Sequence, residues 1–224
     1  MKLANNLYFY SEQGMLDCNT YVINRNPGVI IDPGNPDRLS AKVDALRRDG
    51  IDPQGINIII NTHLHIDHCS SNEAFKKLSG ASIALHPVQK DNYQLVVVDG
   101  ARLFGMEPGG FTEDYCLERD MFRAGELEIE FIEAPGHSPD CVCFYLRPEK
   151  ILICGDVLFD HNTGRVDLPG GNGAALKESI ETLSKLEIEY LLPGHMDIVE
   201  GAAQVTENFD FIRGNIFPWL LPAL

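Results

Sequence analysis

Short apolar runs bounded by turn residues dominate the first part of the chain. They predict strands at residues 7–10, 19–24, 28–31 and 56–60. The last of these runs is continuously apolar, which is typical of a strand buried on both faces. Between the third and fourth runs, Leu39, Val43 and Leu46 recur at helical spacing and end before Gly50, so we expect a helix over 36–48.

The same alternation continues to the end of the chain. It predicts helices at 71–78, 174–186 and 201–213, and strands at 82–86, 127–133, 141–146, 150–154 and 190–192. Strands that follow each other closely indicate antiparallel pairing, whereas interleaved helices indicate parallel pairing. We therefore expect one α/β domain over 1–224 (α+β by some schemes), in which two mixed sheets pack together with helices outside. The glycine-rich stretch 88–123 is predicted to be a helical and loop insertion that covers a site and forms one wall of a pocket.

The composition is that of a globular protein with an acidic surface. Of the 224 residues, 44% are hydrophobic and 23% charged, which allows a substantial core. The formal net charge of −15 repels phosphate backbones and anionic lipids, so we expect no nucleic-acid or membrane partner.

Several features favour a cytoplasmic location. The first six residues lack the pattern of a signal peptide, and no apolar stretch is long enough to span a membrane. Six cysteines without a Cys-x-x-Cys pair are interpreted as reduced thiols. Cys141 and Cys143 have the spacing of one strand face, and we interpret them as core residues rather than metal ligands.

Three histidines and an aspartate crowd the segment Thr-His-Leu-His-Ile-Asp-His at 62–68, directly after a predicted buried strand. Imidazole and carboxylate groups are the donors that borderline divalent metals prefer. In extended geometry His63 and His65 point the same way and can bind one ion. Asp67 and His68, after the chain turns, can face a second ion. The segment predicts a metal site.

This segment resembles the H-x-H-x-D-H signature of the metallo-β-lactamase superfamily, and further motifs of that family follow in the same order. They are Asp-Pro-Gly at 32–34, Pro-Gly-His-Ser-Pro at 135–139, Gly-Asp at 155–156 and Pro-Gly-His at 193–195. The resemblance implies a four-layer αββα sandwich. It also implies that His63, His65 and His137 hold one metal, that Asp67, His68 and His195 hold a second, and that Asp156 bridges them. Zinc is the expected metal, with iron and manganese as alternatives.

The resemblance also sorts between branches of the superfamily. True metallo-β-lactamases do not have an aspartate at the position of Asp156 and are exported, so we do not expect hydrolysis of antibiotics. The segment Gly-Arg-Val-Asp-Leu-Pro-Gly-Gly-Asn at 164–172 is similar to one in single-domain glyoxalase II-like hydrolases. This likeness makes Arg165 a candidate substrate contact, while an ion pair between Arg165 and Asp167 that fixes the loop is a compatible alternative. Only 29 residues follow His195, so we expect no counterpart of the helical domain that completes the glutathione site of full-length glyoxalase II. Asp140 replaces a common glycine.

The expected activity is hydrolysis of a small acyl thioester of the glyoxalase II type by a metal-bridging hydroxide, with Asp67 or Asp156 orienting the nucleophile or carrying its proton. Persulfide dioxygenase chemistry, with one iron on His63, His137 and Asp156, is an alternative, as are lactone hydrolysis and a non-catalytic metal-binding role. His161 is a weaker candidate for substrate contact. His86 and Asp32 are interpreted as structural, and the apolar C-terminal tail 216–224 as packing on the domain or in a homodimer.

Overall fold

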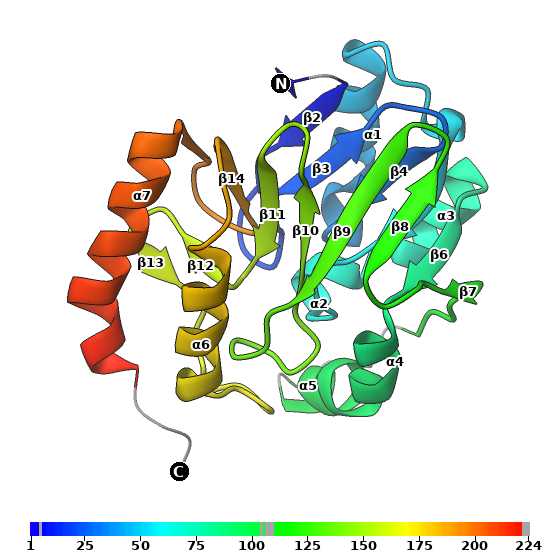
Figure 1. The fold of residues 1–224 in the computed structure, drawn as a ribbon. Helices are drawn as coiled ribbons and strands as arrows, with labels where there is room; N and C mark the ends of the chain where they lie inside the picture. Colours follow the sequence, from blue (N-terminus) through cyan, green and yellow to red (C-terminus); the bar gives the residue numbers. More distant parts are fainter. Residues whose placement is uncertain (5, 104, 106–109, 221–224) are drawn as a thin grey trace.

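The computed structural model describes residues 1–4, 6–103, 105 and 110–220. Two β-sheets face each other, and helices cover the outer side of each sheet (Figure 1). The apolar side chains between the sheets come from both of them: Ile31 and Ile60 share one buried cluster with Phe144 and Ile153. This arrangement confirms the predicted α/β class and the four-layer sandwich.

The first sheet has strands in chain order, with antiparallel pairing up to β4 and parallel pairing after it. Its strands are β1 (Lys2–Ala4), β2 (Leu7–Tyr10), β3 (Thr20–Ile23), β4 (Gly28–Ile31), β5 (Ile56–Ile60), β6 (Ser82–Leu85) and β7 (Tyr115–Cys116). On its outer face lie α1 (Pro36–Arg48) and α3 (Asn72–Ser79), whose Val43, Leu46 and Phe75 join a second buried cluster.

The second sheet has the order β15-β14-β11-β10-β9-β8 and is antiparallel except for the pair β11 and β14. Its strands are β8 (Met121–Ala124), β9 (Leu127–Glu133), β10 (Val142–Leu146), β11 (Ile151–Gly155), β14 (Tyr190–Pro193) and β15 (Val199–Glu200). A short hairpin separates β11 from the next helix and consists of β12 (Leu158–Phe159) and β13 (Asn162–Thr163). The outer face is covered by α6 (Gly173–Leu183) and α7 (Ala202–Phe211) through a third buried cluster.

The predicted insertion at 88–123 is only partly a separate helical element. It contains α4 (Pro87–Tyr93), the π-helix η2 (Gln94–Asp99) and α5 (Gly100–Leu103). However, β7 and β8 belong to the two main sheets, so the described insertion proper ends before them. Residues 104 and 106–109 of this stretch lie outside the described residues. Sequence periodicity missed β7 because both of its residues are exposed, and it pairs with β6 through its backbone.

The remaining elements are short. They are η1 (Pro53–Gly55), α2 (Ile66–Cys69), η3 (Ile212–Ile216) and η4 (Phe217–Trp219). Of the apolar tail, Ile216, Phe217 and Leu220 pack partly against the α6 and α7 cluster, whereas the Trp219 side chain is 81% exposed. Residues 221–224 of the predicted tail lie outside the described residues. Among the described helices, none is both long and apolar enough to cross a membrane.

The fold brings several strand ends to one edge of the sandwich. His63 follows the parallel strand β5, Asp156 follows β11, and His195 follows β14, while His137 follows β9. Because each of these strands ends at this edge, residues 128 positions apart, such as Asp67 and His195, lie next to each other. The short helix α2 lies at this end of the sheets, near α4 and α5 (Figure 1).

Candidate metal centre

The first group of converging side chains consists of three histidines. His63 and His65 come from the turn after β5, and His137 comes from the turn after β9. His65 Nδ1 lies 3.1 Å from His63 Nε2 and 2.9 Å from His137 Nε2. Three imidazole nitrogens that face a common point form the usual ligand arrangement for a borderline divalent cation. The structure thus brings together the first predicted ligand set.

A second group of histidines and carboxylates lies beside the first. His195 Nε2 lies 3.3 Å from Asp67 Oδ2 and 3.4 Å from Asp156 Oδ2, and His68 Nε2 lies 3.3 Å from Asp156 Oδ1. Asp156 also reaches the first group, since its Oδ2 lies 3.5 Å from His137 Nε2. The carboxylate of Asp156 therefore stands between the two groups, where a bridging ligand would be placed. Within each of three sets, the donor atoms lie within 4.8 Å of one another; the sets are His63, His65 and His137, then His63, His68 and Asp156, then Asp67, His68 and His195.

Two buried atoms in this cluster fit a bound cation. His68 Nε2 and Asp156 Oδ1 have no hydrogen-bond partner among the described residues, although both atoms are shielded from solvent. An unsatisfied buried polar group costs about 1–3 kcal/mol, and more if charged. A divalent cation would accept electron pairs from both atoms, so the residues present fit the metal site that the motifs imply.

Burial sets the protonation state of the first group. Burial and the neighbouring His137 lower the pKa of His65 to about 3, and burial also lowers the pKa values of His63 and His137. These imidazoles are therefore neutral at pH 7, which is the form that binds metal. Burial opposes protonation of His195 as well, but the carboxylates of Asp156 and Asp67 outweigh it and raise its pKa to about 11. The carboxylates of the second group thus attract positive charge, which a bound cation would supply.

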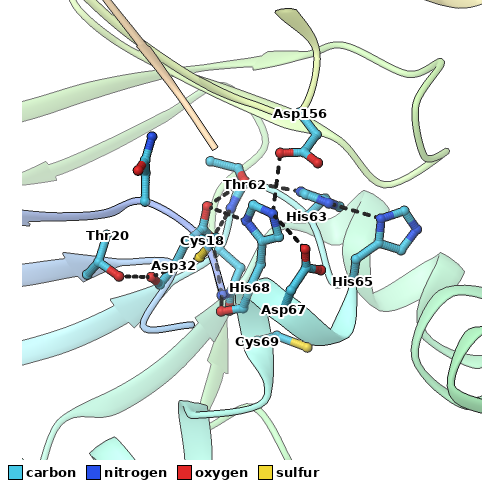
Figure 2. Close-up of polar contacts among 12 residues, drawn as sticks. Cys18, Thr20, Asp32, Thr62, His63, His65, Asp67, His68, Cys69 and Asp156 are labelled. Atoms are coloured by element: carbon cyan, nitrogen blue, oxygen red, sulfur yellow. Dashed lines mark hydrogen bonds and ion pairs between the residues drawn. The ribbon is translucent and has the colours of Figure 1, made fainter. Parts of the chain in front are cut away.

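Asp32 holds His68 of the second ligand group from β4, the neighbour of β5 in the same sheet. It follows β4 with a φ of 53°, is 1% exposed, and accepts hydrogen bonds from Thr62 N at 2.8 Å and Thr62 Oγ1 at 2.6 Å. Its Oδ2 also accepts a hydrogen bond from His68 Nδ1 at 3.0 Å (Figure 2). Asn61 Nδ2 donates to its Oδ1 at 3.2 Å. The turn aspartate therefore also fixes the ring orientation of His68, with Nε2 directed toward Asp156.

Glu12 plays the corresponding part for His195, and nothing in the sequence pointed to it. Its Oε2 accepts a hydrogen bond from His195 Nδ1 at 2.7 Å, and its Oε1 accepts one from Met196 N at 3.1 Å. The loop that carries Glu12 is anchored by Asp17, whose carboxylate pairs with the buried Lys42 at 2.8 Å. Both ionic partners are at most 4% exposed, and Lys42 also donates to the backbone carbonyls of Cys18 in this loop and of Pro33 after β4. This anchor holds the loop against the metal centre.

Asp140, which departs from the family pattern, connects two ligand segments. It is fully buried, and its Oδ2 accepts a hydrogen bond from Leu64 N at 2.8 Å, between His63 and His65. Its Oδ1 accepts one from Ser138 Oγ, next to His137. A carboxylate at this position therefore links the turn after β9 to the turn after β5.

A cavity of about 420 Å³ opens beside the ligands. Apart from the candidate ligands, its described lining is mostly apolar and comes from separate segments: Leu16, Ile66, Val96, Gly100, Phe159, Thr163, Gly164, Arg165, Leu168 and Pro169. Val96 and Gly100 belong to η2 and α5, so the 88–123 segment does form one wall, as expected. The cavity gives a substrate direct access to His65, Asp67, His137, Asp156 and His195.

The two predicted substrate contacts lie in different surroundings. Arg165 lines the cavity and makes a bidentate ion pair with Asp167, at 2.5 and 2.6 Å, so both roles considered for it are compatible with its position. Its backbone carbonyl accepts a hydrogen bond from His137 Nδ1 at 2.7 Å. His161 pairs with Asp160 and packs edge-on against Phe211, and the described cavity lining does not include it. Its contact with substrate stays a prediction. His86 is buried and caps α4, as its structural interpretation requires.

Comparison with known proteins identifies the family. The model of the metallo-β-lactamase superfamily matches residues 14–195, so the chain belongs to this superfamily of metal-dependent hydrolases. It is 30% identical over 206 residues to the "Probable metallo-hydrolase MJ0888" of Methanocaldococcus jannaschii, covering 88% of this chain and 94% of that protein. It is 28% identical over 181 residues to the acyl-coenzyme A thioesterase MBLAC2 of Gallus gallus, covering 73% of this chain and 64% of that protein.

Two solved structures are similar over almost the whole chain. One is the B3 metallo-β-lactamase BLEG-1, with a TM-score of 0.76, 27% identity, and coverage of 90% of this chain and 96% of that one. The other is TTHA1623 in a di-iron-bound form, with a TM-score of 0.73, 28% identity, and coverage of 89% and 96%. These likenesses agree with a divalent metal site at the His/Asp cluster and leave the identity of the metal open.

Proposed function

We propose that this protein is a binuclear metal hydrolase, with zinc as the expected metal, that cleaves the acyl–sulfur bond of a thioester. The observation that carries this proposal is the position of the segment 164–172, which resembles that of glyoxalase II-like hydrolases. Gly164, Arg165, Leu168 and Pro169 of this segment line the cavity at the metal ligands. The relative named as an acyl-coenzyme A thioesterase supports the same reaction class.

In the proposed reaction, the metals held by the two ligand groups have two tasks, activation of water and polarisation of the substrate. Divalent cations held there would lower the pKa of water toward neutrality and polarise the substrate carbonyl. Asp67 is partly exposed and lines the cavity, with its Oδ2 3.3 Å from His195 Nε2. Its exposure to the cavity supports a role in which it receives a proton from the attacking water. The new carbon–oxygen bond forms as the carbon–sulfur bond breaks, and the proton held by Asp67 passes to the departing thiolate.

The proposal is tested by free-thiol release from a panel of thioesters that includes S-lactoylglutathione, with metal-replete protein. The expected result is thiol release that falls about 100-fold or more in Asp67→Asn. Glu73→Gln, which changes a carboxylate on the outer helix α3, serves as the control and keeps wild-type rates. A metal-replete protein that releases thiol from no member of the panel contradicts the proposal.

The same panel separates the alternatives. Oxygen consumption with a persulfide and one iron per chain would assign the dioxygenase reaction to His63, His137 and Asp156 instead. Ring opening of lactones, or of a β-lactam as in the B3 enzyme that this chain resembles in structure, without thiol release would assign a hydrolase of another substrate class. The rates with thioester, persulfide, lactone and β-lactam substrates are therefore measured on one preparation of known metal content and compared with one another.

A further inference from the structure

The cavity lining beside the candidate metal ligands is mostly apolar, and its apolar side chains come from five separate parts of the chain. Leu16 comes from the loop after β2, Ile66 from α2, Val96 from η2, Phe159 from β12 and Leu168 from the 164–172 segment. The Leu16 side chain is 46% exposed. Full burial of a leucine side chain would stabilise the protein or its complex by about 1.5–3 kcal/mol, so a ligand that covers Leu16 gains part of this free energy. Apolar side chains that are left partly open around a catalytic centre are typical of a site for an apolar group.

The distribution of charge in this cavity also favours an apolar, uncharged ligand group. Among the described lining residues, Arg165 is the only charged side chain that is not a candidate ligand, and Asp167 already pairs with two of its nitrogens. The chain as a whole carries a net charge of −15. A charged acyl group would therefore lose its hydration inside the cavity and gain no unpaired cation among these residues.

The size of the cavity limits the length of such a group. Its volume of about 420 Å³ lies toward the lower end of the roughly 300–1,000 Å³ that is usual for small-molecule sites. Gly100 leaves part of this space free: a Cβ added there would have Leu95 O, at 3.9 Å, as its nearest described neighbour. Gly100 begins helix α5 and has ordinary helical dihedral angles (φ −60°, ψ −48°), so a larger side chain is compatible with its backbone.

We infer that the acyl group of the substrate is uncharged and apolar, of short to medium chain length, and that it lies against Leu16, Val96 and Leu168 with Gly100 setting the limit on its length. This inference rests on the proposed thioester hydrolysis and names the substrate class of the same site. It also implies that a hydroxylated acyl group such as lactoyl binds less well than isobutanoyl, which has a methyl group in place of the hydroxyl.

The first test measures kcat/KM for thioesters of N-acetylcysteamine, a neutral thiol, with acyl chains of increasing length. We expect kcat/KM to rise about fourfold per methylene until the cavity is full, because each buried methylene is worth about 0.8 kcal/mol. Gly100→Leu shifts the optimum to shorter chains. The matched control is Gly214→Leu, since Gly214 has no described atom within 4 Å of an added Cβ and lies in η3, outside the described cavity lining. This control keeps the wild-type profile.

The second test does not depend on turnover. Alkyl hydroxamates ligate metals, so their chains probe the same wall in metal-replete protein. The expected dissociation constant falls with each methylene in the wild type and reaches its minimum at a shorter chain in Gly100→Leu. A dissociation constant that does not change with chain length, or an identical profile in Gly100→Leu, overturns the inference. If hydroxamates show the chain-length effect while no thioester is cleaved, recognition of an apolar group stands and the proposed reaction fails.

Discussion

Glu12 and His195, 183 positions apart in the chain, are joined by a hydrogen bond of 2.7 Å from His195 Nδ1 to Glu12 Oε2. This bond fixes the proton on Nδ1 and leaves Nε2 directed toward Asp67 and Asp156. A carboxylate behind a metal-binding histidine orients the ring and strengthens it as a ligand. The loop before β3 therefore supports the second candidate ligand group through His195.

Glu12→Gln is expected to weaken binding of the second metal by about 10- to 100-fold, because the amide nitrogen that takes the place of Oε2 cannot accept a hydrogen bond from His195 Nδ1. The amide oxygen can still accept from Met196 N, so the loop keeps its conformation. Isothermal titration of metal-free protein checks this, with Glu73→Gln as the control for loss of one negative charge. An unchanged second affinity in Glu12→Gln would show that the hydrogen bond has no part in metal binding.

Asp32→Asn tests the other carboxylate that acts through a ligand. Asparagine tolerates the positive φ of 53°, so the substitution removes charge without straining the backbone. If the amide oxygen keeps the bond from Thr62 N, the amide nitrogen takes the place of Oδ2 and cannot accept from His68 Nδ1 or Thr62 Oγ1. We therefore expect a loss of about 1–3 kcal/mol in the free energy of unfolding. Denaturant unfolding of the metal-free protein measures this, and metal affinity should fall in parallel. A variant with wild-type stability and affinity would refute the assigned role.

Gly194→Ala is expected to disrupt the ligand geometry by crowding alone. An added Cβ would lie 2.2 Å from Asp156 Oδ1 and 2.7 Å from His68 Cε1, so at least one of these side chains must move. Metal content after purification should fall well below that of the wild type. Gly214→Ala is the matched control and should retain full metal content, with stability raised by about 0.5–1 kcal/mol for replacing a helical glycine. Equal metal content in both variants would show that metal binding does not require the close approach of Gly194 to the ligands.

Asp167→Asn should change substrate preference rather than stability. It removes the partner of Arg165, which is exposed and lines the cavity, so the guanidinium becomes available to an anionic substrate. We expect kcat/KM for S-lactoylglutathione to rise relative to that for a neutral thioester. Glu130→Gln is the control, because it weakens the comparable pair between Glu130 on β9 and Arg147, both outside the described cavity lining. If the ratio of the two substrates is the same in wild type and Asp167→Asn, Arg165 does not contact the charged part of the substrate.

The sequence could predict the candidate ligands because they lie in compact motifs directly after apolar strands. His63 to His68 fall within one turn after β5, and Asp156 follows the continuously buried β11. Helix α1 and strand β9 also occur at the predicted residues, since their apolar spacing is regular and their ends carry turn residues. Where the buried positions in the fold match the periodic apolar positions in the sequence, the sequence pattern predicts the observed helix or strand.

The parts that sequence reasoning missed have either no pattern or a weak one. Glu12 lies in an irregular loop, and its partner His195 is close only because β3 and β14 belong to facing sheets; Asn19 and Tyr21 bind the backbone at Pro193 across this junction. Helix α4 did carry a signal, because Pro87 occupies its first turn and Gln89 completes a capping box with His86. The role of Asp140 depends on a hydrogen bond to Leu64 N, a contact between distant segments that a single sequence does not reveal.

The most direct test of the account is thiol release by metal-free protein as zinc is added in measured equivalents, with a medium-chain acyl thioester of N-acetylcysteamine as substrate. Two ligand groups that share Asp156 predict that the rate rises until about two equivalents per chain are bound and then stays constant. Full activity at one equivalent, or no thiol release at any metal content, would contradict a binuclear thioester hydrolase.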